Sequence, residues 1–132
     1  EKEKAKLNEF FLSPKLLCRK AALNAVSLLR DEKQEQMAVD LYDQQPESIR
    51  QEILRVVRAI NSGRHTQFLV RAFRTATSKT TREIALTSLY AYGEEGRSTF
   101  ELLRHDLNEN EKDRRLMAQI DAVDILNQMR TL

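Results

Sequence analysis

The sequence predicts an all-α protein, a solenoid of about four stacked helix pairs, and three observations lead to this prediction. The first is a helical pattern that occurs four times, in which apolar residues stand three, seven and ten positions after an arginine. The copies begin at Arg19, Arg50, Arg82 and Arg115, so their spacing is 31, 32 and then 33 residues. A constant period of about 30 to 45 residues in helical sequence is typical of stacked helix pairs.

The second observation is the composition. The chain has 132 residues, 41% hydrophobic and 32% charged, which is enough for one compact soluble domain. It contains three glycines, two prolines and no tryptophan, which suits helices joined by short turns and disfavours a β-sandwich or barrel. We therefore expect a single domain over residues 1–132, with repeats near 1–31, 32–62, 63–93 and 94–132.

The third observation is a shorter amphipathic segment before each arginine helix. In the third copy, for example, Leu69, Val70 and Phe73 have the spacing of one buried helical stripe. Each segment and its arginine helix form one pair, which predicts roughly eight antiparallel helices. Their expected ranges are 3–12, 14–30, 34–44, 46–61, 64–76, 79–92, 95–108 and 112–130.

Local signals justify the helices of the first two pairs. Leu7 and Phe10 form the apolar face of the segment 3–12, and Leu41 has the corresponding place in the segment 34–44. Pro14 and Pro46 stand at or near the first turn of the helices that follow, where the missing N–H costs no hydrogen bond.

Glycines and a capping motif justify the helices of the last two pairs. Gly63 and Gly93 follow periodic runs, as expected where a helix ends. The residues Thr80–Glu83 match a capping box at the start of the helix predicted at 79–92. Leu107 takes the apolar role in the segment 95–108, and a polar turn at 108–112 precedes the last helix.

The arginine helices resemble the second helices of HEAT-like repeats, which typically carry a hydrophobe and an arginine followed by alanine and leucine at fixed steps. The matching segments are Leu17–Val26, Ser48–Ile60 and Thr81–Leu89. The resemblance covers nearly the whole chain and implies a right-handed α-solenoid whose second helices line a concave face; it specifies fold rather than activity. The loop aspartate that usually faces the arginine is missing here, and Ser13, Gln45 and Ser78 stand nearby instead.

The repeated arginines are predicted to be structural. On a helical wheel each lies on the same face as the buried positions three, four and seven residues later. The aliphatic stem can pack there while the guanidinium donates to carbonyl groups or to a side chain of the neighbouring repeat. We therefore assign none of the four to a binding site.

The residues that could carry chemistry are few. His65 and His105 are forty residues apart, and neither has a second histidine or a cysteine at metal-ligand spacing. Cys18, the single cysteine, lies in a strongly apolar helix and is expected to be a small buried hydrophobe. We expect no enzyme activity, no catalytic residues, no metal site and no cofactor.

The residues that point away from the core predict where a partner binds. These are the first, fifth and eighth positions after each arginine, where Arg55 and Arg58 stand one turn apart and are expected to lie beside Tyr90. Paired guanidinium groups suit carboxylate or phosphate. Residues 55–82 also contain seven basic residues and no acidic one. The predicted groove residues are Lys20, Asn24, Arg55, Arg58, Thr87 and Tyr90.

The last helix has a different pattern in these outward positions. Leu116, Ile120 and Val123 stand where the other copies carry mostly polar groups. A terminal repeat normally has a polar outer face. Two interpretations follow: this helix is rotated so that its apolar side packs inward, or a partner covers it. That partner is either a second copy of the chain or residues beyond Leu132.

The sequence thus favours a protein-interaction scaffold whose groove takes a protein or an acidic peptide. The alternative is nucleic-acid binding through the basic residues of the middle repeat, although the net charge is only +2. Because the chain begins with Glu1 and a charged stretch, we expect it to be part of a larger protein. We expect a cytoplasmic location, within either a soluble or a membrane-associated protein, and no membrane insertion by this segment.

Overall fold

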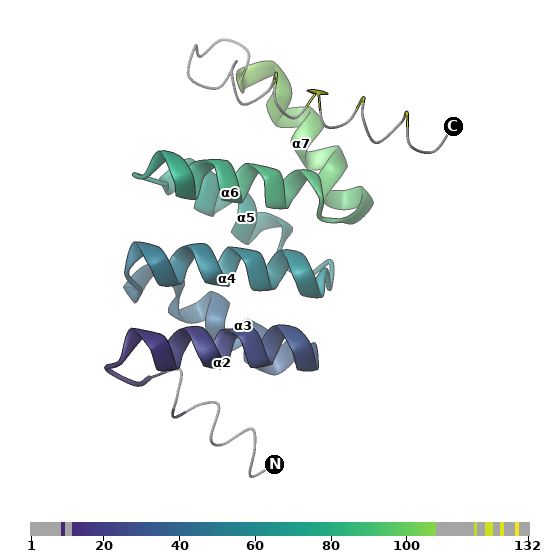
Figure 1. Cartoon of the computed structure of the whole chain (residues 1–132). Coiled ribbons are helices and arrows are strands. Elements are labelled where there is room, and N and C mark those ends of the chain that lie inside the picture. The colour runs from purple at the N-terminus through teal and green to yellow at the C-terminus, as the bar shows by residue number, and fades with distance from the viewer. Residues whose placement is uncertain are drawn as a thin grey trace.

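The computed structural model (Figure 1) describes residues 12–107 and, outside that range, Glu9, Ala118, Asp121, Ala122, Ile125 and Met129. Its elements are α2 (Leu16–Leu29), α3 (Glu32–Leu41), the 3-10 turn η1 (Tyr42–Gln44), α4 (Glu47–Ile60), α5 (Thr66–Thr75), α6 (Lys79–Tyr90) and α7 (Gly93–Leu107). No strand occurs among these described residues, which confirms the all-α class. Six predicted helices match these elements to within a few residues, whereas those predicted at 3–12 and 112–130 lie mostly outside the described part.

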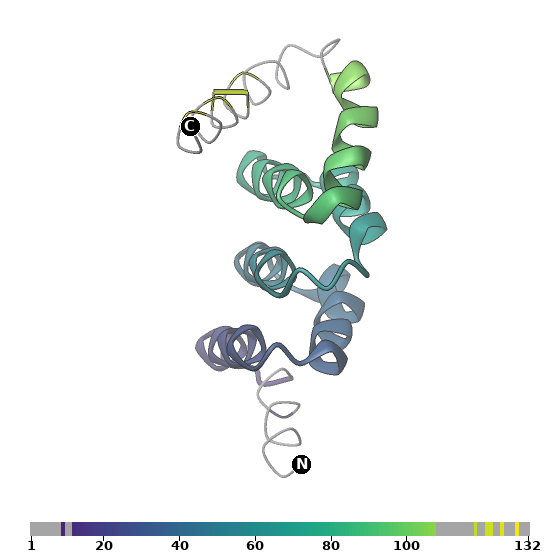
Figure 2. The same ribbon diagram turned by 90° about the vertical axis from the view of Figure 1, so that its right-hand side faces the viewer.

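The helices form two layers. In Figure 1, α2, α4 and α6 lie side by side, and α4 contacts both of the others. We call these three helices the front layer. Figure 2 shows them end-on, with α3 and α5 on their other side as a back layer. The helix α7 packs against α6 and also contacts α5. The front layer therefore consists of three of the predicted arginine helices.

Polar side chains cap the N-termini of α3 and α6. The Asp31 carboxylate accepts hydrogen bonds from two backbone N–H groups in the first turn of α3. The Ser78 hydroxyl accepts one from the N–H of Thr81, at 3.3 Å. The predicted capping box would place the cap of α6 at Thr80, and this prediction is wrong. The cap is Ser78, two residues earlier, because Ser78 is the residue with extended backbone at the start of the helix.

Two residues other than glycine end front-layer helices in the left-handed conformation. Arg30 follows α2 with φ 52°, and Asn61 follows α4 with φ 51°. Gly63 (φ 80°) therefore belongs to the loop after the cap. Arg30 also connects the two helix ends, because its Nη2 donates to the carbonyl oxygen of Ile60 at 2.8 Å.

The core lies between the two layers and follows the repeat. Leu23, Leu54 and Leu86, four positions after their arginines, are completely buried. The third and seventh positions are buried in the first three copies, as predicted: Ala22, Ile53, Ala85, Val26, Val57 and Leu89. A buried leucine contributes about 1.5–3 kcal/mol, so these columns account for much of the cohesion of the stack.

The tenth position and the fourth copy differ from the prediction. Ile60 and Tyr92 are buried, but Leu29 at the same position is 60% exposed. The reason is that α4 and α6 each have a preceding front-layer helix to pack on, whereas α2 has none in the described part of the chain. In the fourth copy the three predicted core residues are all exposed: Ala118, Ala122 and Ile125. The core register of the first three copies does not continue there.

Two of the repeated arginines, Arg19 and Arg50, bond to the turns that precede their helices, and Arg115 lies outside the described residues. Arg19 donates from Nε to the carbonyl oxygen of Ser13 at 2.6 Å and from Nη1 to Oε1 of Gln45 at 2.8 Å. Arg50 donates to two carbonyl oxygens of η1, at 3.2 and 2.6 Å. The guanidinium carbon of Arg82 lies 4.3 Å from the centre of an aromatic ring of α5. These contacts agree with a structural role, and Gln45 links the first copy to the second.

Candidate interaction surface

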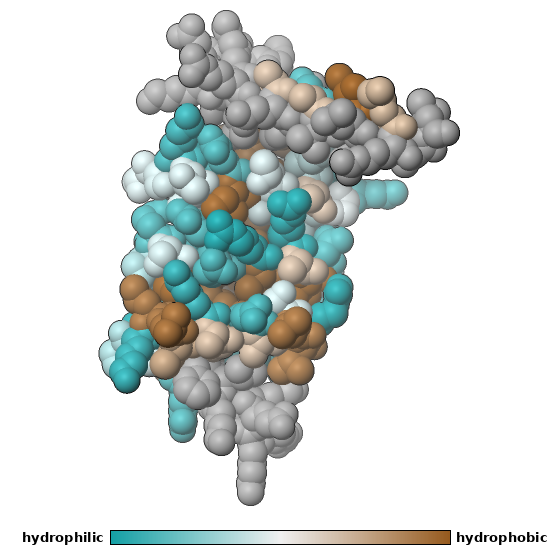
Figure 3. All heavy atoms as spheres, in the orientation of Figure 1, coloured by the Kyte–Doolittle hydropathy of each residue, from teal (hydrophilic) through white to brown (hydrophobic). Residues whose placement is uncertain are grey.

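The predicted partner-binding residues belong to α2, α4 and α6, the helices of the front layer, whose outward surface is seen in Figure 3. On α2 and α4 these side chains are exposed, whereas on α6 they are half-buried. The exposed ones are Lys20, Asn24, Arg55 and Arg58, and the half-buried ones are Thr87 and Tyr90. Exposure of these side chains is thus complete on α2 and α4 and partial on α6.

Arg55 and Arg58 differ in their surroundings. The Nη1 of Arg55 donates to Oε1 of Glu52 at 2.7 Å. Such an exposed pair, one turn apart, contributes little to stability. Arg58 is exposed and has no hydrogen-bond or ion-pair partner among the described residues. A carboxylate from another molecule could therefore bind Arg58 without breaking an ion pair inside the protein.

Tyr90 is directed toward α7. Its ring packs edge-on against Phe100, with the ring centres 5.0 Å apart. The guanidinium carbon of Arg97 lies 3.8 Å from the centre of the Tyr90 ring. We expected Tyr90 to lie beside Arg55 and Arg58, but these two contacts are with residues of α7 instead. A shallow, open depression at this corner is lined by Tyr90, Ala91, Gly93, Glu94, Arg97 and Ser98.

The structure adds an apolar row that sequence reasoning missed. Leu17 is 79% exposed and Leu28 77% exposed, and Ala21 between them is also exposed. Their spacings of four and seven residues place all three on one face of α2; we call them the α2 leucine row. Figure 3 shows apolar surface along this part of the front layer. A sequence signal existed, since the positions of Leu17 and Leu28 hold serine, threonine or alanine in the next two copies.

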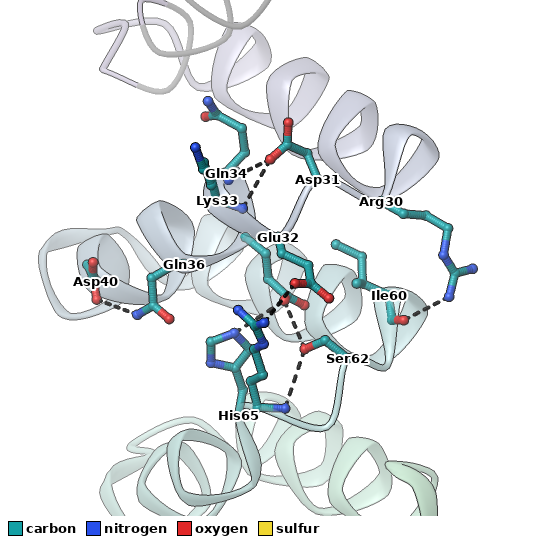
Figure 4. Close-up of polar contacts among 12 residues, drawn as sticks. Arg30, Asp31, Glu32, Lys33, Gln34, Gln36, Asp40, Ile60, Ser62 and His65 are labelled. Atoms are coloured by element: carbon teal, nitrogen blue, oxygen red, sulfur yellow. Dashed lines mark hydrogen bonds and ion pairs between the residues drawn. The ribbon is translucent and has the colours of Figure 1, made fainter.

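A buried polar cluster lies between the layers, at the end of α4 (Figure 4). The Oε1 atom of Glu35 accepts a hydrogen bond from Ser62 Oγ at 3.1 Å and lies 3.2 Å from His65 Nε2. The hydroxyl oxygen of Tyr92 accepts from the backbone N–H of His65 at 3.1 Å and lies 3.3 Å from Ser62 Oγ. This cluster joins α3, the α4–α5 loop and the segment after α6.

Burial determines the electrostatics of this cluster. The side chain of Glu35 is fully buried and that of His65 only 5% exposed. Burial raises the pKa of Glu35 above its ordinary 4.5, and the nearby His65 and the Ser62 hydrogen bond offset only part of this effect. Ser62 bonds to Glu35 and not to His65, so the three do not form a nucleophile–base relay. The cluster is best described as a structural link between repeats.

The described residues contain no other concentration of reactive groups. Cys18 is a free, half-buried thiol. No three or more histidine, cysteine, aspartate or glutamate side chains of the described part are grouped to hold a metal ion. None of its helices combines the length and apolar character needed to span a bilayer. The predicted apolar interface of Leu116, Ile120 and Val123 lies outside the described residues.

Comparison with known proteins gives no match: no family model fits the sequence, no curated protein matches it, and no solved structure matches it.

Proposed function

We propose that this chain is a right-handed α-solenoid of HEAT-like helix pairs that binds a protein or an acidic peptide on the outward surface of its front layer, as a non-catalytic scaffold. The observation that carries this proposal is Arg58, an exposed guanidinium one turn from Arg55 and without an ion-pair partner in the described part. A planar guanidinium with unused donors suits a carboxylate in both charge and geometry.

The repetition of equivalent contacts supports the architectural part of this proposal. Equivalent leucines of three successive copies are buried in equivalent places, and α4 packs between α2 and α6. Arg19 and Arg50 both bond to the turn before their helix. Repeated packing of each helix pair on its neighbour is the defining feature of a solenoid.

The distribution of charge favours a protein partner over nucleic acid. Three of the seven basic residues between 55 and 82 form ion pairs with other residues that the structure describes: Arg55–Glu52 at 2.7 Å, Arg64–Glu32 at 3.2 Å and Arg71–Asp43 at 2.8 Å. Arg71 and Arg74 belong to α5 in the back layer, on the other side from Arg55 and Arg58. Nucleic-acid affinity depends on several cations aligned along one surface, so nucleic acid remains the alternative function.

The proposal is tested by charge reversal on the front layer. Wild-type protein and the Arg55→Glu/Arg58→Glu variant are used to capture partners from lysate of the source organism. We expect a captured protein to be lost, by tenfold or more, with the variant only. The matched control is Arg71→Glu/Arg74→Glu, which has the same charge change and spacing on the back layer. An equal loss with both variants, or retention with both, would contradict the assignment of the front layer.

A salt titration separates the protein and nucleic-acid alternatives. Duplex DNA is added to the wild-type protein at about 50 and 200 mM salt, an interval over which phosphate-driven affinity falls steeply. We expect no measurable affinity at either concentration. Binding at low salt that is lost at high salt, and lost in the Arg55→Glu/Arg58→Glu variant, would establish the alternative.

A further inference from the structure

We propose that the side of α2 turned away from α4 packs against one more helix pair of the same kind, which precedes residues 1–132 in a longer polypeptide. This inference rests on the solenoid architecture of the proposed function and is independent of the partner that the front layer binds. It is carried by the way in which the front-layer helices pack on one another, since α2 is the outermost of the three (Figure 1).

Three positions of each copy form the side that faces the preceding front-layer helix. They are the position before the repeated arginine and the sixth and tenth positions after it, and their spacings of seven and four residues place them on one side of a helix. On α6 the first of them is Thr81, whose hydroxyl donates to Glu47 and accepts from Gln51 of α4. We call these three positions the rear side of each front-layer helix.

The rear side is buried in the second and third copies and open in the first. All six rear-side residues of the second and third copies are buried: Ile49, Val56, Ile60, Thr81, Ser88 and Tyr92. On α2 the same positions hold Cys18 and Ala25, which are half-buried, and Leu29, which is 60% exposed. The open rear side of α2 thus corresponds to a contact that both of the following front-layer helices make.

The chemistry of this side of α2 is that of a contact surface and not of a free end. Cys18, Ala25 and Leu29 carry no charge and no strong hydrogen-bonding group. The terminal repeat of a solenoid normally has a polar outer face, because only solvent lies beyond it. An apolar rear side on the outermost helix therefore indicates that another front-layer helix packs there, as α2 packs on α4.

The established contacts define what the additional helix presents to α2. The α4–α6 contact joins two different sides, because the rear side of α6 meets the side of α4 that carries Glu47 and Gln51. In a second copy of this chain the corresponding sides of α2 and α4 are occupied by the next helix, and that of α6 includes Tyr90, which packs against Phe100 of α7. The additional helix is therefore expected from a preceding helix pair rather than from a second copy.

The length of the chain agrees with this assignment. Residues 30–46 connect α2 to α4 and residues 61–78 connect α4 to α6, through a back-layer helix in each case. These connections have 17 and 18 residues, and 15 residues precede α2. Fifteen residues are close to the length of one connection, and the shortest front-layer helix, α6, needs 12 more. Residues 1–15 can therefore supply the connection but not the helix itself.

The first test is the coding sequence upstream of Glu1. The repeated arginine recurs every 31 to 33 residues. We therefore expect an arginine at the same distance before Arg19, followed by apolar residues at its third, seventh and tenth positions. A start codon directly before Glu1, or an upstream sequence without this pattern, would overturn the inference.

The second test measures the contact through Cys18, the single cysteine of residues 1–132. Residues 1–132 and the longer gene product are treated with iodoacetamide under native conditions, and alkylation of Cys18 is followed by mass spectrometry. Because a preceding helix would cover this thiol, we expect it to react at least tenfold more slowly in the longer product. Equal rates in the two proteins would contradict the inference.

A third test uses Leu29→Gln and does not depend on the thiol. In residues 1–132 this side chain is mostly exposed, so we expect the melting temperature to change by less than about 2 °C. In the longer product the same substitution places an amide in a buried contact, and the melting temperature should fall by at least about 4 °C. An equally small change in both proteins would show that Leu29 is not covered.

The matched control for this test is Leu17→Gln. Leu17 is exposed on the same helix but lies outside the rear side. The residues at its position in the next two copies, Ser48 and Thr80, are exposed although their helices are covered. The control substitution should therefore change the melting temperature little in either protein.

Further outcomes separate this inference from its alternatives. A dimer of residues 1–132 in analytical ultracentrifugation that Leu29→Gln dissociates would assign the rear side of α2 to a second copy and overturn the inference. If Cys18 reacts equally in both proteins while Arg55→Glu/Arg58→Glu still abolishes partner capture, this inference fails and the proposed interaction surface stands. If Cys18 is protected in the longer product but capture is unaffected by that variant, the inference stands and the proposed interaction surface fails.

Discussion

At the scale of single residues, the most unusual feature is the buried carboxyl of Glu35. One oxygen contacts Ser62 and His65, while the other, Oε2, is buried without a hydrogen-bond partner. A buried and partly unsatisfied carboxylate disfavours the folded state. Its contacts with Ser62 and His65, which in turn contact Tyr92, connect α3 to the α4–α5 loop and to the segment after α6, so the polar cluster constrains how neighbouring repeats dock.

The first prediction concerns the pH dependence of stability. Because burial raises the pKa of Glu35 above 4.5 in the folded state, the unfolded chain loses this proton first. The contribution of Glu35 to the free energy of unfolding is therefore present below pH 4.5 and is lost as pH rises through the folded-state pKa. Glu35→Gln cannot ionise, so its stability relative to wild type should increase with pH above 4.5.

This prediction is checked by urea denaturation at a series of pH values. The control is Gln67→Ala, because Gln67 is exposed on α5 and does not titrate, so its substitution should shift stability equally at every pH. A Glu35→Gln curve parallel to that of the wild type would show that the ionisation of Glu35 is not linked to folding.

At the scale of elements, two helices of this chain end in residues that are uncommon at such positions. The helices α2 and α4 end in left-handed conformations at Arg30 and Asn61, positions where glycine is the most frequent residue. Arg30 is compensated by its hydrogen bond to the end of α4. Asn61 can adopt this conformation at less cost than most residues, because its short polar side chain bonds locally.

The second prediction is that glycine at position 61, the left-handed end of α4, stabilises the protein. Asn61→Gly should raise the free energy of unfolding by up to about 1 kcal/mol, because glycine adopts positive φ without steric cost. Ala21→Gly, at an exposed site inside α2, should lower it by about 0.5–1 kcal/mol. Thermal or urea denaturation of the two variants compares the signs. If both variants are less stable than the wild type, the side chain of Asn61 adds more to the free energy of unfolding than its positive φ removes.

At the scale of the whole molecule, the front layer is continuous through α4. The helix α4 packs against both α2 and α6, and Glu47 and Gln51 both bond to Thr81 of α6. A stack of repeats is stabilised mainly through such neighbour contacts. The middle helix should therefore affect the stability of the whole chain.

The third prediction follows from this position of α4. Leu54 is completely buried in the middle copy, and Leu54→Ala should destabilise the chain by about 2–5 kcal/mol while unfolding stays a single transition. Ala59→Ser, at an exposed site of the same helix, should change stability by less than about 0.5 kcal/mol. Circular dichroism and tyrosine fluorescence are followed in urea. Transitions at different urea concentrations for the two probes would show that the repeats unfold independently.

The sequence by itself determined the six helices of the described part, their order, and the columns buried three, four and seven positions after the arginines of the first three copies. These depend on interactions within a few residues: the 3.6-residue periodicity of apolar side chains and the turns that the arginines bind. It also identified Lys20, Asn24, Arg55 and Arg58 as outward, because the face of a helix opposite its apolar stripe follows from the same periodicity.

Only the tertiary structure decided which distant residues meet. Glu35 and His65 are thirty residues apart, and nothing in their local sequence pairs them; the path of the intervening helices brings them together. The exposure of Leu29, the turn of Tyr90 toward α7 and the loss of register at Ala118, Ala122 and Ile125 likewise depend on which neighbour each helix has. Periodicity defines the face that a helix can bury, whereas the neighbouring helices decide whether that face is covered.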